Sequence, residues 1–559
     1  MTTRAIDDSA TTPPIDLVPS RALKRRGRRV GAFTALALAG SLALAGCGAG
    51  RTDDPATGES DGGDSSSAAS IIVGTTDKLT ALDPAGNYDN GSYTVEIQVF
   101  QFLYGFKPGE VAPQPDVAES CDYAEPTVFR CTVKEGLKFA NGHDLTASDV
   151  AFSFTRQLTI NDANGPASLL ANLDSVEATD DVTVDFHLKN ANDQTFLQIL
   201  ATPAGPIVDE EVFSATALTS GDDIVAGNAF SGPYTITNFQ ANDTISFTPY
   251  ADYIGVQDPV ANGGVTLKTY EEGTNLSLAI TNGDIDVAYR SLTPTDIDTL
   301  KQNSDVVVHE GPGGEIRYIN FNFNTMPGDT PEQKFAVRQA IASLVDRDAL
   351  STQVYKGLYT PLCSYVPDGQ DGATSAVCDT YPLDEAAAAK YLADAGVATP
   401  VTLALQYNPD HYGDSSDQEY ALIKSQLEAS GLFAVQLQAT EWVSYQEERI
   451  KDTYPAYQFG WFPDFPDPDN YISPFFVENS MLQNHFSSPE IQALITAEVT
   501  ESDHDARMKI IEQIQLELAQ KYLPTLPLLQ GTSIAVSRAD VDGVVLDASF
   551  QFRYSTLSK

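Results

Sequence analysis

The chain has 559 residues and a mass of 60.1 kDa, a length that predicts roughly three to four domains or one large domain with insertions. Its composition, 42% hydrophobic and 20% charged, is typical of a globular protein and not of a disordered chain or a coiled coil. The formal net charge of −44 argues against a nucleic-acid partner, because phosphate contacts need lysine and arginine. It also disfavours a polyanionic ligand.

The first 46 residues have the pattern of a lipoprotein signal peptide. Six basic side chains lie between Arg21 and Arg29, and an apolar run from Val30 to Ala45 follows them. The run is near the lower length limit for a membrane-spanning helix, so a retained anchor is the alternative. Leu44-Ala45-Gly46-Cys47 matches the bacterial lipobox, in which the cysteine carries the lipid and the chain is cut before it. We therefore predict a signal peptide over 1–46, a lipid (palmitate) on Cys47, and a location at the outer face of the cytoplasmic membrane.

A tether is predicted after the lipidation site. Residues 48–70 are rich in glycine, serine and aspartate and nearly free of large apolar side chains, which predicts a flexible segment over 47–70. A Gly/Ser-type coil of this length has a root-mean-square span of roughly 25–30 Å. We expect the folded body, residues 71–559, to lie just above the membrane.

The body begins with strands. Ile71–Val73 is a short apolar strand, and Val128–Val133 and Val182–Leu188 alternate partly between apolar and polar residues. Helices follow later in the chain. Thr330-Pro331-Glu332-Gln333 has the form of a capping box with proline at the first helical position. Asp384 begins an alanine-rich helix that ends at Gly396, and Ser488 begins another. Strands that alternate with helices favour α/β lobes.

The four cysteines other than Cys47 form two pairs that are close in sequence. An exported chain permits disulfides, so we predict Cys121–Cys131 and Cys363–Cys378. A turn at Glu125-Pro126-Thr127 would bring the first pair together. Free buried thiols are the alternative.

No catalytic or metal-binding motif stands out. The one G-x-S-x-G string, Gly58–Gly62, lies in the tether, with no strand before it and no helix after it. The six histidines are scattered without metal-ligand spacing. The sequence gives no reason to expect an enzyme, a cofactor or a metal site.

The strongest pattern lies between Phe129 and Phe154. Residues 129–142 (FRCTVKEGLKFANG) and 145–154 (LTASDVAFSF) have the order strand, tight glycine turn, second strand and capped helix, with Thr146 as N-cap and Asp149 three residues on. This block resembles the signature of family 5 of the extracytoplasmic solute-binding proteins, the dipeptide and oligopeptide binders of ABC importers. Further blocks follow in the family's order at 231–234, 282–288, 318–325, 337–341 and 345–347. The resemblance runs from about Ile71 to Leu528.

The resemblance implies an α/β fold of two lobes, a periplasmic-binding-protein-like clamp (type II, cluster C-like) with an extra domain inserted in the first lobe. Such a clamp closes around its ligand by a hinge. The implied first lobe covers about 71–110, 228–310 and 525–559, the inserted domain about 111–227, and the second lobe about 311–524. The implied function is capture of peptides by a monomeric protein, which delivers them to the permease subunits of an ABC importer.

The resemblance also implies a ligand site around Trp461. In peptide binders of the family the segment G-W-x-x-D-x-x-D-P lies in the cleft, and residues 460–468 match it. Asp464 would accept a charge-assisted hydrogen bond from the ligand's α-ammonium. Trp461 would form a cleft wall, Gly460 would allow close backbone approach, and Trp442 matches a second family tryptophan near the ligand side chains.

One position departs from the family's pattern. Tripeptide-type members can place an arginine three residues before the cleft tryptophan to meet a ligand carboxylate, and this chain has Gln458 there. The carboxylate partner is therefore not placed, with Arg317 and Arg449 as candidates. The length and residue preference of the peptide stay open.

Other interpretations of the same residues are open at this point. Asp464, Asp467, Asp469 and Asn470 alternatively form a solvated turn or supply oxygen ligands to a cation such as calcium. The two tryptophans alternatively belong to the core. The ligand is alternatively a nickel chelate, an oligosaccharide or an amine-bearing compound. A third class is a lipoprotein that serves signalling or adhesion without transport.

Overall fold

The computed structural model describes residues 68–290, 292–409, 411–413, 415–478, 480–547 and 551–559. The predicted signal peptide, the lipidation site Cys47 and most of the tether therefore lie outside the described residues. Within the described ranges, no helix combines the length and the apolar character that a membrane crossing requires.

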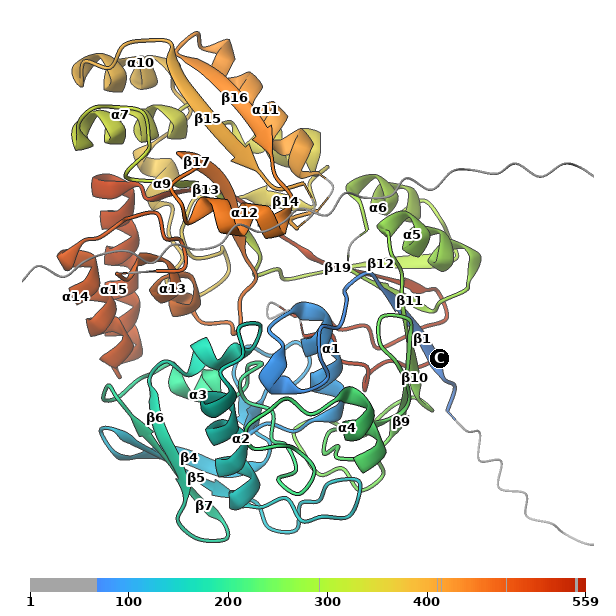
Figure 1. Cartoon of the computed structure of the whole chain (residues 1–559). Coiled ribbons are helices and arrows are strands. Elements are labelled where there is room, and N and C mark those ends of the chain that lie inside the picture. Colours follow the sequence, from blue (N-terminus) through green and yellow to red (C-terminus); the bar gives the residue numbers. More distant parts are fainter. Residues whose placement is uncertain (1–67, 291, 410, 414, 479, 548–550) are drawn as a thin grey trace, which may run out of the picture. The chain divides into compact units, whose positions relative to one another are not determined.

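Seven strands from distant parts of the chain form a mixed sheet in the order β12-β19-β11-β1-β10-β9-β8 (Figure 1). The central strand β1 is parallel to both of its neighbours, β10 and β11, and the outer pairs are antiparallel. Four of the five residues of β1 are buried, as expected for a strand whose two faces are both covered. The strands are β1 (Ile71–Thr75), β8 (Tyr234–Gln240), β9 (Thr244–Pro249), β10 (Val265–Thr269), β11 (Val287–Tyr289), β12 (Val306–Gly311) and β19 (Ser533–Arg538).

A second sheet has six strands in the order β14-β18-β13-β17-β15-β16. Its central strand β13 is antiparallel to β17 and β18, and β15 is parallel to β16 and β17. All six residues of β13 are buried. The strands are β13 (Ile316–Phe321), β14 (Tyr359–Pro361), β15 (Val401–Tyr407), β16 (Phe433–Ala439), β17 (Ala456–Trp461) and β18 (Thr525–Gly531).

A third sheet is antiparallel, with four strands in the order β4-β5-β7-β6. Its strands are β4 (Ala118–Glu125), β5 (Val128–Val133), β6 (Leu173–Ala178) and β7 (Thr183–Leu188), so two of the predicted strands are confirmed with nearly the predicted bounds. Helix α2 (Ala147–Ile160) lies against β6 and β7 (Figure 1). A two-stranded sheet, β2 (Tyr104–Gly105) with β3 (Gln114–Pro115), precedes β4.

The other helices connect these strands. In chain order they are α1 (Asn90–Val99), α3 (Phe196–Ile199), α4 (Gly221–Gly227), α5 (Gly273–Asn282), α6 (Pro294–Leu300), α7 (Pro331–Ala342), α8 (Arg347–Ala349), α9 (Ala376–Thr380), α10 (Glu385–Asp394), α11 (Ser416–Ala429), α12 (Trp442–Arg449), α13 (Ser473–Phe476), α14 (Pro489–Thr500) and α15 (His504–Glu517). Short 3₁₀ and π turns are η1 (Pro84–Gly86), η2 (Pro166–Leu170), η3 (Leu350–Val354), η4 (Pro468–Tyr471) and η5 (Leu518–Tyr522).

The predicted helix caps are present. Asp384 accepts a hydrogen bond from the backbone N–H of the third residue after it, Ser488 does the same, and Thr146 forms a full capping box with Asp149. At α7 the Thr330 side chain accepts from the N–H of Gln333 as predicted. The reciprocal bond differs, because the Gln333 side chain accepts from the N–H of Asp329 and not from that of Thr330.

The seven-, six- and four-stranded sheets each have a hydrophobic core of their own. The core of the six-stranded sheet extends to α7, α10, α11, α14 and α15, and the four-stranded sheet buries α2 and the region around α3. Phe465 follows β17 of the six-stranded sheet in sequence, yet it is packed in the core of the four-stranded sheet. The 462–471 segment, which begins directly after β17, is therefore held by contacts with another part of the fold.

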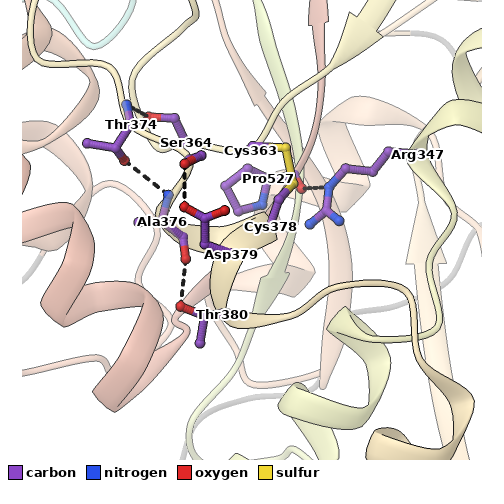
Figure 2. The surroundings of a disulfide bond; sticks show 10 residues. Arg347, Cys363, Ser364, Thr374, Ala376, Cys378, Asp379, Thr380 and Pro527 are labelled. Atoms are coloured by element: carbon purple, nitrogen blue, oxygen red, sulfur yellow. Dashed lines mark hydrogen bonds between the residues drawn. A yellow bond between two sulfur atoms is a disulfide. The ribbon is translucent and has the colours of Figure 1, made fainter.

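Both predicted disulfides are present. Cys121 and Cys131 are directly opposite in the β4–β5 hairpin, with Cα atoms 4.1 Å apart. Cys363 lies just after β14 and is bonded to Cys378 of α9, with Cα atoms 5.1 Å apart (Figure 2). Figure 2 also shows the bond from Arg347 Nε to the carbonyl of Pro527, at 2.8 Å, which ties α8 to β18 beside this disulfide.

The lobe bounds given above stay predictions, but one segment differs from them. Residues 525–531, which the predicted bounds place in the first lobe, form β18 of the six-stranded sheet. The chain enters the seven-stranded sheet only with β19, so a boundary at about residue 532 describes the strands better. The cause is pairing with β13, a partner about 200 residues earlier, which local sequence does not reveal.

Candidate functional site

A cavity of about 700 Å³ is lined by residues of the seven-stranded and the six-stranded sheet, the two large sheets of the fold. From the six-stranded sheet come Arg317 of β13, with Glu315 directly before that strand, and Tyr359 of β14. From the seven-stranded sheet come Ser533 and Ile534 of β19. The loop residues Tyr412 and Phe462 add aromatic surface. The volume lies in the range of small-molecule sites, and the lining combines aromatic rings with charges of both signs.

Asp464 lies near the start of the 462–471 segment but does not line this cavity. Its carboxylate is buried, with 8% of the residue exposed, and accepts a hydrogen bond of 2.6 Å from the hydroxyl of Tyr88. The Asn470 amide donates to the other carboxylate oxygen at 3.3 Å. Burial raises the pKa of Asp464 to about 6, and the bonds from Tyr88 and Asn470 limit the rise. Perturbed carboxylates occur both at functional sites and in structural networks, so this pKa does not by itself assign a role to Asp464.

Trp461 is half-buried beside Asp464. Its indole N–H donates to the side-chain oxygen of Asn470 at 2.9 Å, and the backbone N–H of Asp464 donates to the same oxygen at 2.9 Å. The ring of Phe475 meets the indole edge to face, with centroids 5.0 Å apart. The next residue, Phe462, lines the cavity, and Trp461 does not. Asn470 thus fixes Trp461 and Asp464 relative to each other.

Gly460 lies opposite Arg317 in the β13–β17 pair. A Cβ atom at position 460 would come within 2.9 Å of the Ile316 carbonyl oxygen, 3.0 Å of the Tyr412 ring and 3.3 Å of Cδ of Arg317. The glycine therefore makes room for two residues that line the cavity. This packing is reason enough for glycine, and close approach of a ligand backbone stays a prediction.

Gln458 is nearly fully buried, with 1% exposed. Its side-chain oxygen accepts from the backbone N–H of Asn408 at 2.9 Å, and its amide donates to the Ser416 hydroxyl at 3.0 Å. Gln458 thus joins the end of β15 to the start of α11 and does not line the cavity.

Trp442, the first residue of α12, is half-buried in an aromatic stack. It lies parallel to the ring of His411 at 3.7 Å between centroids and meets Tyr412 edge to face at 5.6 Å. His411 and Tyr412 line the cavity and Trp442 does not. The structure therefore places Trp442 behind the cavity wall.

Asp467 and Asp469 are buried in a charged cluster and are not solvated turn residues. Arg507 of α15 donates to both oxygens of Asp467, at 2.8 and 2.9 Å, and to Glu498 of α14 at 3.0 Å. Asp469 accepts from the hydroxyl of Ser473. Burial and the neighbouring Asp469 raise the pKa of Glu498 far above its usual range. In the described part of the chain no group of His, Cys, Asp or Glu residues is arranged to hold a metal ion.

The two candidate arginines differ in position. Arg449 donates to the carbonyls of Met481 and Leu482, at 2.9 and 3.2 Å, and does not line the cavity. Arg317 lines it. The residues that sequence reasoning missed are the aromatic side chains around Arg317, because they come from three separate segments. The sequence signal that could have pointed to this part of the site is Arg317 itself, a basic residue inside an otherwise apolar strand.

Comparisons with known proteins agree on one family. Residues 112–483 match the model of the bacterial extracellular solute-binding proteins, family 5 Middle. The chain is 25% identical over 545 residues to a heme-binding protein A of Haemophilus influenzae, covering 91% of this chain and 95% of that protein. It is 25% identical over 502 residues to a probable D,D-dipeptide-binding periplasmic protein of Escherichia coli, covering 88% and 94%.

Solved structures show the same fold. A dipeptide-binding protein of a Pseudoalteromonas species, in complex with Met-Leu, has a TM-score of 0.72 at 20% identity, with 88% of this chain and 100% of that chain covered. The ABC transporter substrate-binding protein CtaP of Listeria monocytogenes has a TM-score of 0.75 at 22% identity, with 88% and 99% covered. The predicted α/β clamp of two lobes is therefore confirmed.

Proposed function

Because the chain belongs to the bacterial extracellular solute-binding proteins of family 5, we propose that it is the substrate-binding component of an ABC importer. It captures peptides between its two lobes and delivers them to the permease subunits. The observation that carries the proposal is the cavity of about 700 Å³ that residues of both large sheets line together. A ligand in this position contacts both lobes, so its binding favours the closed clamp.

The chemistry of the lining supports a peptide. A peptide with free ends carries an ammonium and a carboxylate, and the cavity offers acidic and basic side chains beside aromatic rings. Proteins named for dipeptide binding are among the relatives. Because Asp464 does not line the cavity, the proposal has the amino end of the peptide extend past Phe462 to Asp464, with Trp461 and Trp442 as apolar support. Since Tyr88 now donates to Asp464, the ammonium either displaces this hydroxyl or shares the carboxylate with it.

The alternative ligand is a non-peptide solute such as a nickel chelate, an oligosaccharide or an amine-bearing compound. It is kept because one relative is named for heme binding, and one solved structure of the same fold is a complex with mannopinic acid. Identification of the ligand that the protein carries from its own cells separates the two candidates. A bound peptide supports the first proposal and a bound non-peptide solute supports the second.

The proposal includes attachment to the membrane. The signal peptide over 1–46 would direct export, and a lipid on Cys47 with a flexible tether would hold the protein at the outer face of the cytoplasmic membrane, close to its permease. The proposal takes the protein to be a monomer. Support comes from the lipobox 44–47 after a basic and apolar leader. Two or more acyl chains give stable anchoring where one does not.

Replacing Cys47 with serine is expected to abolish lipidation. The protein should then be released from the membrane or keep its signal peptide, as measured by cell fractionation and intact mass. Membrane attachment equal to that of the unchanged protein, with the same mature mass, would contradict the lipid anchor.

A further inference from the structure

Arg317 is a charged residue in the wall of the cavity. It lies on β13, between β17 and β18, and only 3% of it is exposed. A buried guanidinium is costly unless its N–H groups are paired. The hydrogen-bond partners of each guanidinium nitrogen therefore show which donors are left for a ligand.

The guanidinium is only partly satisfied. Its Nε donates to Glu315, and its Nη2 donates to the Tyr359 hydroxyl at a long 3.3 Å. Its Nη1 has no hydrogen-bond partner among the described residues. Burial opposes the charge, but Glu315 and the other acidic and phenolic groups nearby together outweigh burial and raise the pKa of Arg317 above its usual range. The side chain is a permanent cation with donor capacity to spare.

The surroundings hold this cation in place. The rings of Tyr412 and Tyr359 lie 5.0 and 5.5 Å from the guanidinium carbon, at cation–π distance. The Tyr359 hydroxyl also donates to Glu315 at 2.8 Å, so Glu315 is engaged by two groups. Gly460 leaves the space that the Arg317 side chain occupies. An oriented guanidinium suits recognition of a planar carboxylate.

The other charges of the lining are mostly paired. Asp77 lies 3.3 Å from Arg290, and Glu271 lies 2.7 Å from Lys78. Glu272 lines the cavity and has no ion pair within the described ranges. The cavity thus combines a cation with an unfilled hydrogen-bond donor and an unpaired carboxylate, a combination that suits a ligand with charges of both signs.

We propose that Arg317 binds the carboxylate of the ligand, so that the cavity takes peptides with a free carboxyl terminus. This inference rests on the proposed function and adds the group that the other end of the peptide meets. Arg317 pairs with Gly460, which is four residues before Asp464, so the two proposed contacts lie on neighbouring parts of the fold.

The first test compares two forms of each peptide on the unchanged protein. A pool of synthetic di- to pentapeptides is prepared with free amino termini, once as carboxylic acids and once as isotope-labelled carboxamides, and captured peptides are weighed by native mass spectrometry. We expect the acid forms to be enriched about tenfold or more, because charged hydrogen bonds are stronger. Equal capture of both forms overturns this inference and leaves peptide capture standing. Capture of neither form overturns both.

The second test assigns the preference to Arg317. Arg317→Gln should capture acids and amides equally, and Arg317→Lys should keep a reduced preference, because it keeps the charge and loses the fork. Arg130→Gln is the control, since it removes the same charge from β5, outside the cavity lining, and should behave as the unchanged protein. A full preference for acids in Arg317→Gln overturns the assignment. Where Arg317→Gln does not fold, Arg317→Lys decides, and a preference for acids equal to that of the unchanged protein overturns the assignment.

Discussion

Replacing Arg507 with methionine is expected to lower the free energy of unfolding by about 3–5 kcal/mol, the typical cost of removing one partner of a buried ion pair. Arg507 donates to both oxygens of Asp467 and to Glu498, and its side chain is 9% exposed. Its loss leaves the carboxylate of Asp467 buried without a counter-charge. Because Asp467 lies in the 462–471 segment, the variant should also loosen this part of the candidate site. Chemical unfolding followed by circular dichroism measures the effect.

Arg130 provides a matched control for this prediction. It also forms two hydrogen bonds with one carboxylate, that of Asp185, both at 2.6 Å. Its side chain is 49% exposed, and water screens exposed ion pairs. Arg130→Met should therefore cost much less than Arg507→Met. Adding Asp467→Asn to Arg507→Met should recover part of the loss, because the buried negative charge of Asp467 is then removed as well. Equal losses for the two single variants would contradict the role of burial.

Replacing Asp464 with asparagine is expected to weaken binding of free-amino peptides by about a hundredfold to several thousandfold, which corresponds to about 3–5 kcal/mol. Asparagine keeps the shape and still accepts from Tyr88, so the variant tests the charge alone. N-acetylation of the peptide should cause a similar loss on the unchanged protein, since it removes the ammonium. Isothermal calorimetry measures both. An affinity within threefold of the unchanged protein, or indifference to acetylation, would show that Asp464 does not bind the ammonium.

The unchanged protein and Asp464→Asn should differ in how their affinity for free-amino peptides depends on pH. Burial raises the pKa of Asp464 to about 6 in the ligand-free protein. An ammonium binds the ionised carboxylate, so affinity should be constant well above pH 6 and fall by up to about tenfold for each pH unit below it. Asp464→Asn should show no such fall. A flat profile for the unchanged protein would contradict the proposed contact.

Features that depend on neighbours in sequence were predictable. The caps at Thr146, Asp384 and Ser488 need only the residues of one helical turn, and the Cys121–Cys131 disulfide needs only the hairpin around Pro126. The resemblance supplied the clamp fold because its blocks follow one another over most of the chain. The caps and the hairpin disulfide each form within a short stretch of chain. The family blocks are recognisable because they occur in a fixed order.

The contacts of the candidate site were not predictable, because they join segments that are far apart in sequence. Tyr88 and Asp464 are 376 residues apart, and the partners of Gln458 lie 42 and 50 residues before it. Which side chains line the cavity depends on the register of β13 against β17, which sets Arg317 opposite Gly460. No local pattern encodes that register, so sequence could name Arg317 as a candidate and could not place it.

Native mass spectrometry of the protein purified from its own cells tests peptide capture most directly. The intact complex is weighed, and the ligand is then released and identified by tandem mass spectrometry. Asp464→Asn and Arg317→Gln, purified in parallel, serve as comparisons. The account predicts peptides with both ends free on the unchanged protein, and much lower occupancy on the two variants. A stoichiometric ligand that is not a peptide, carried equally by all three proteins, would contradict it.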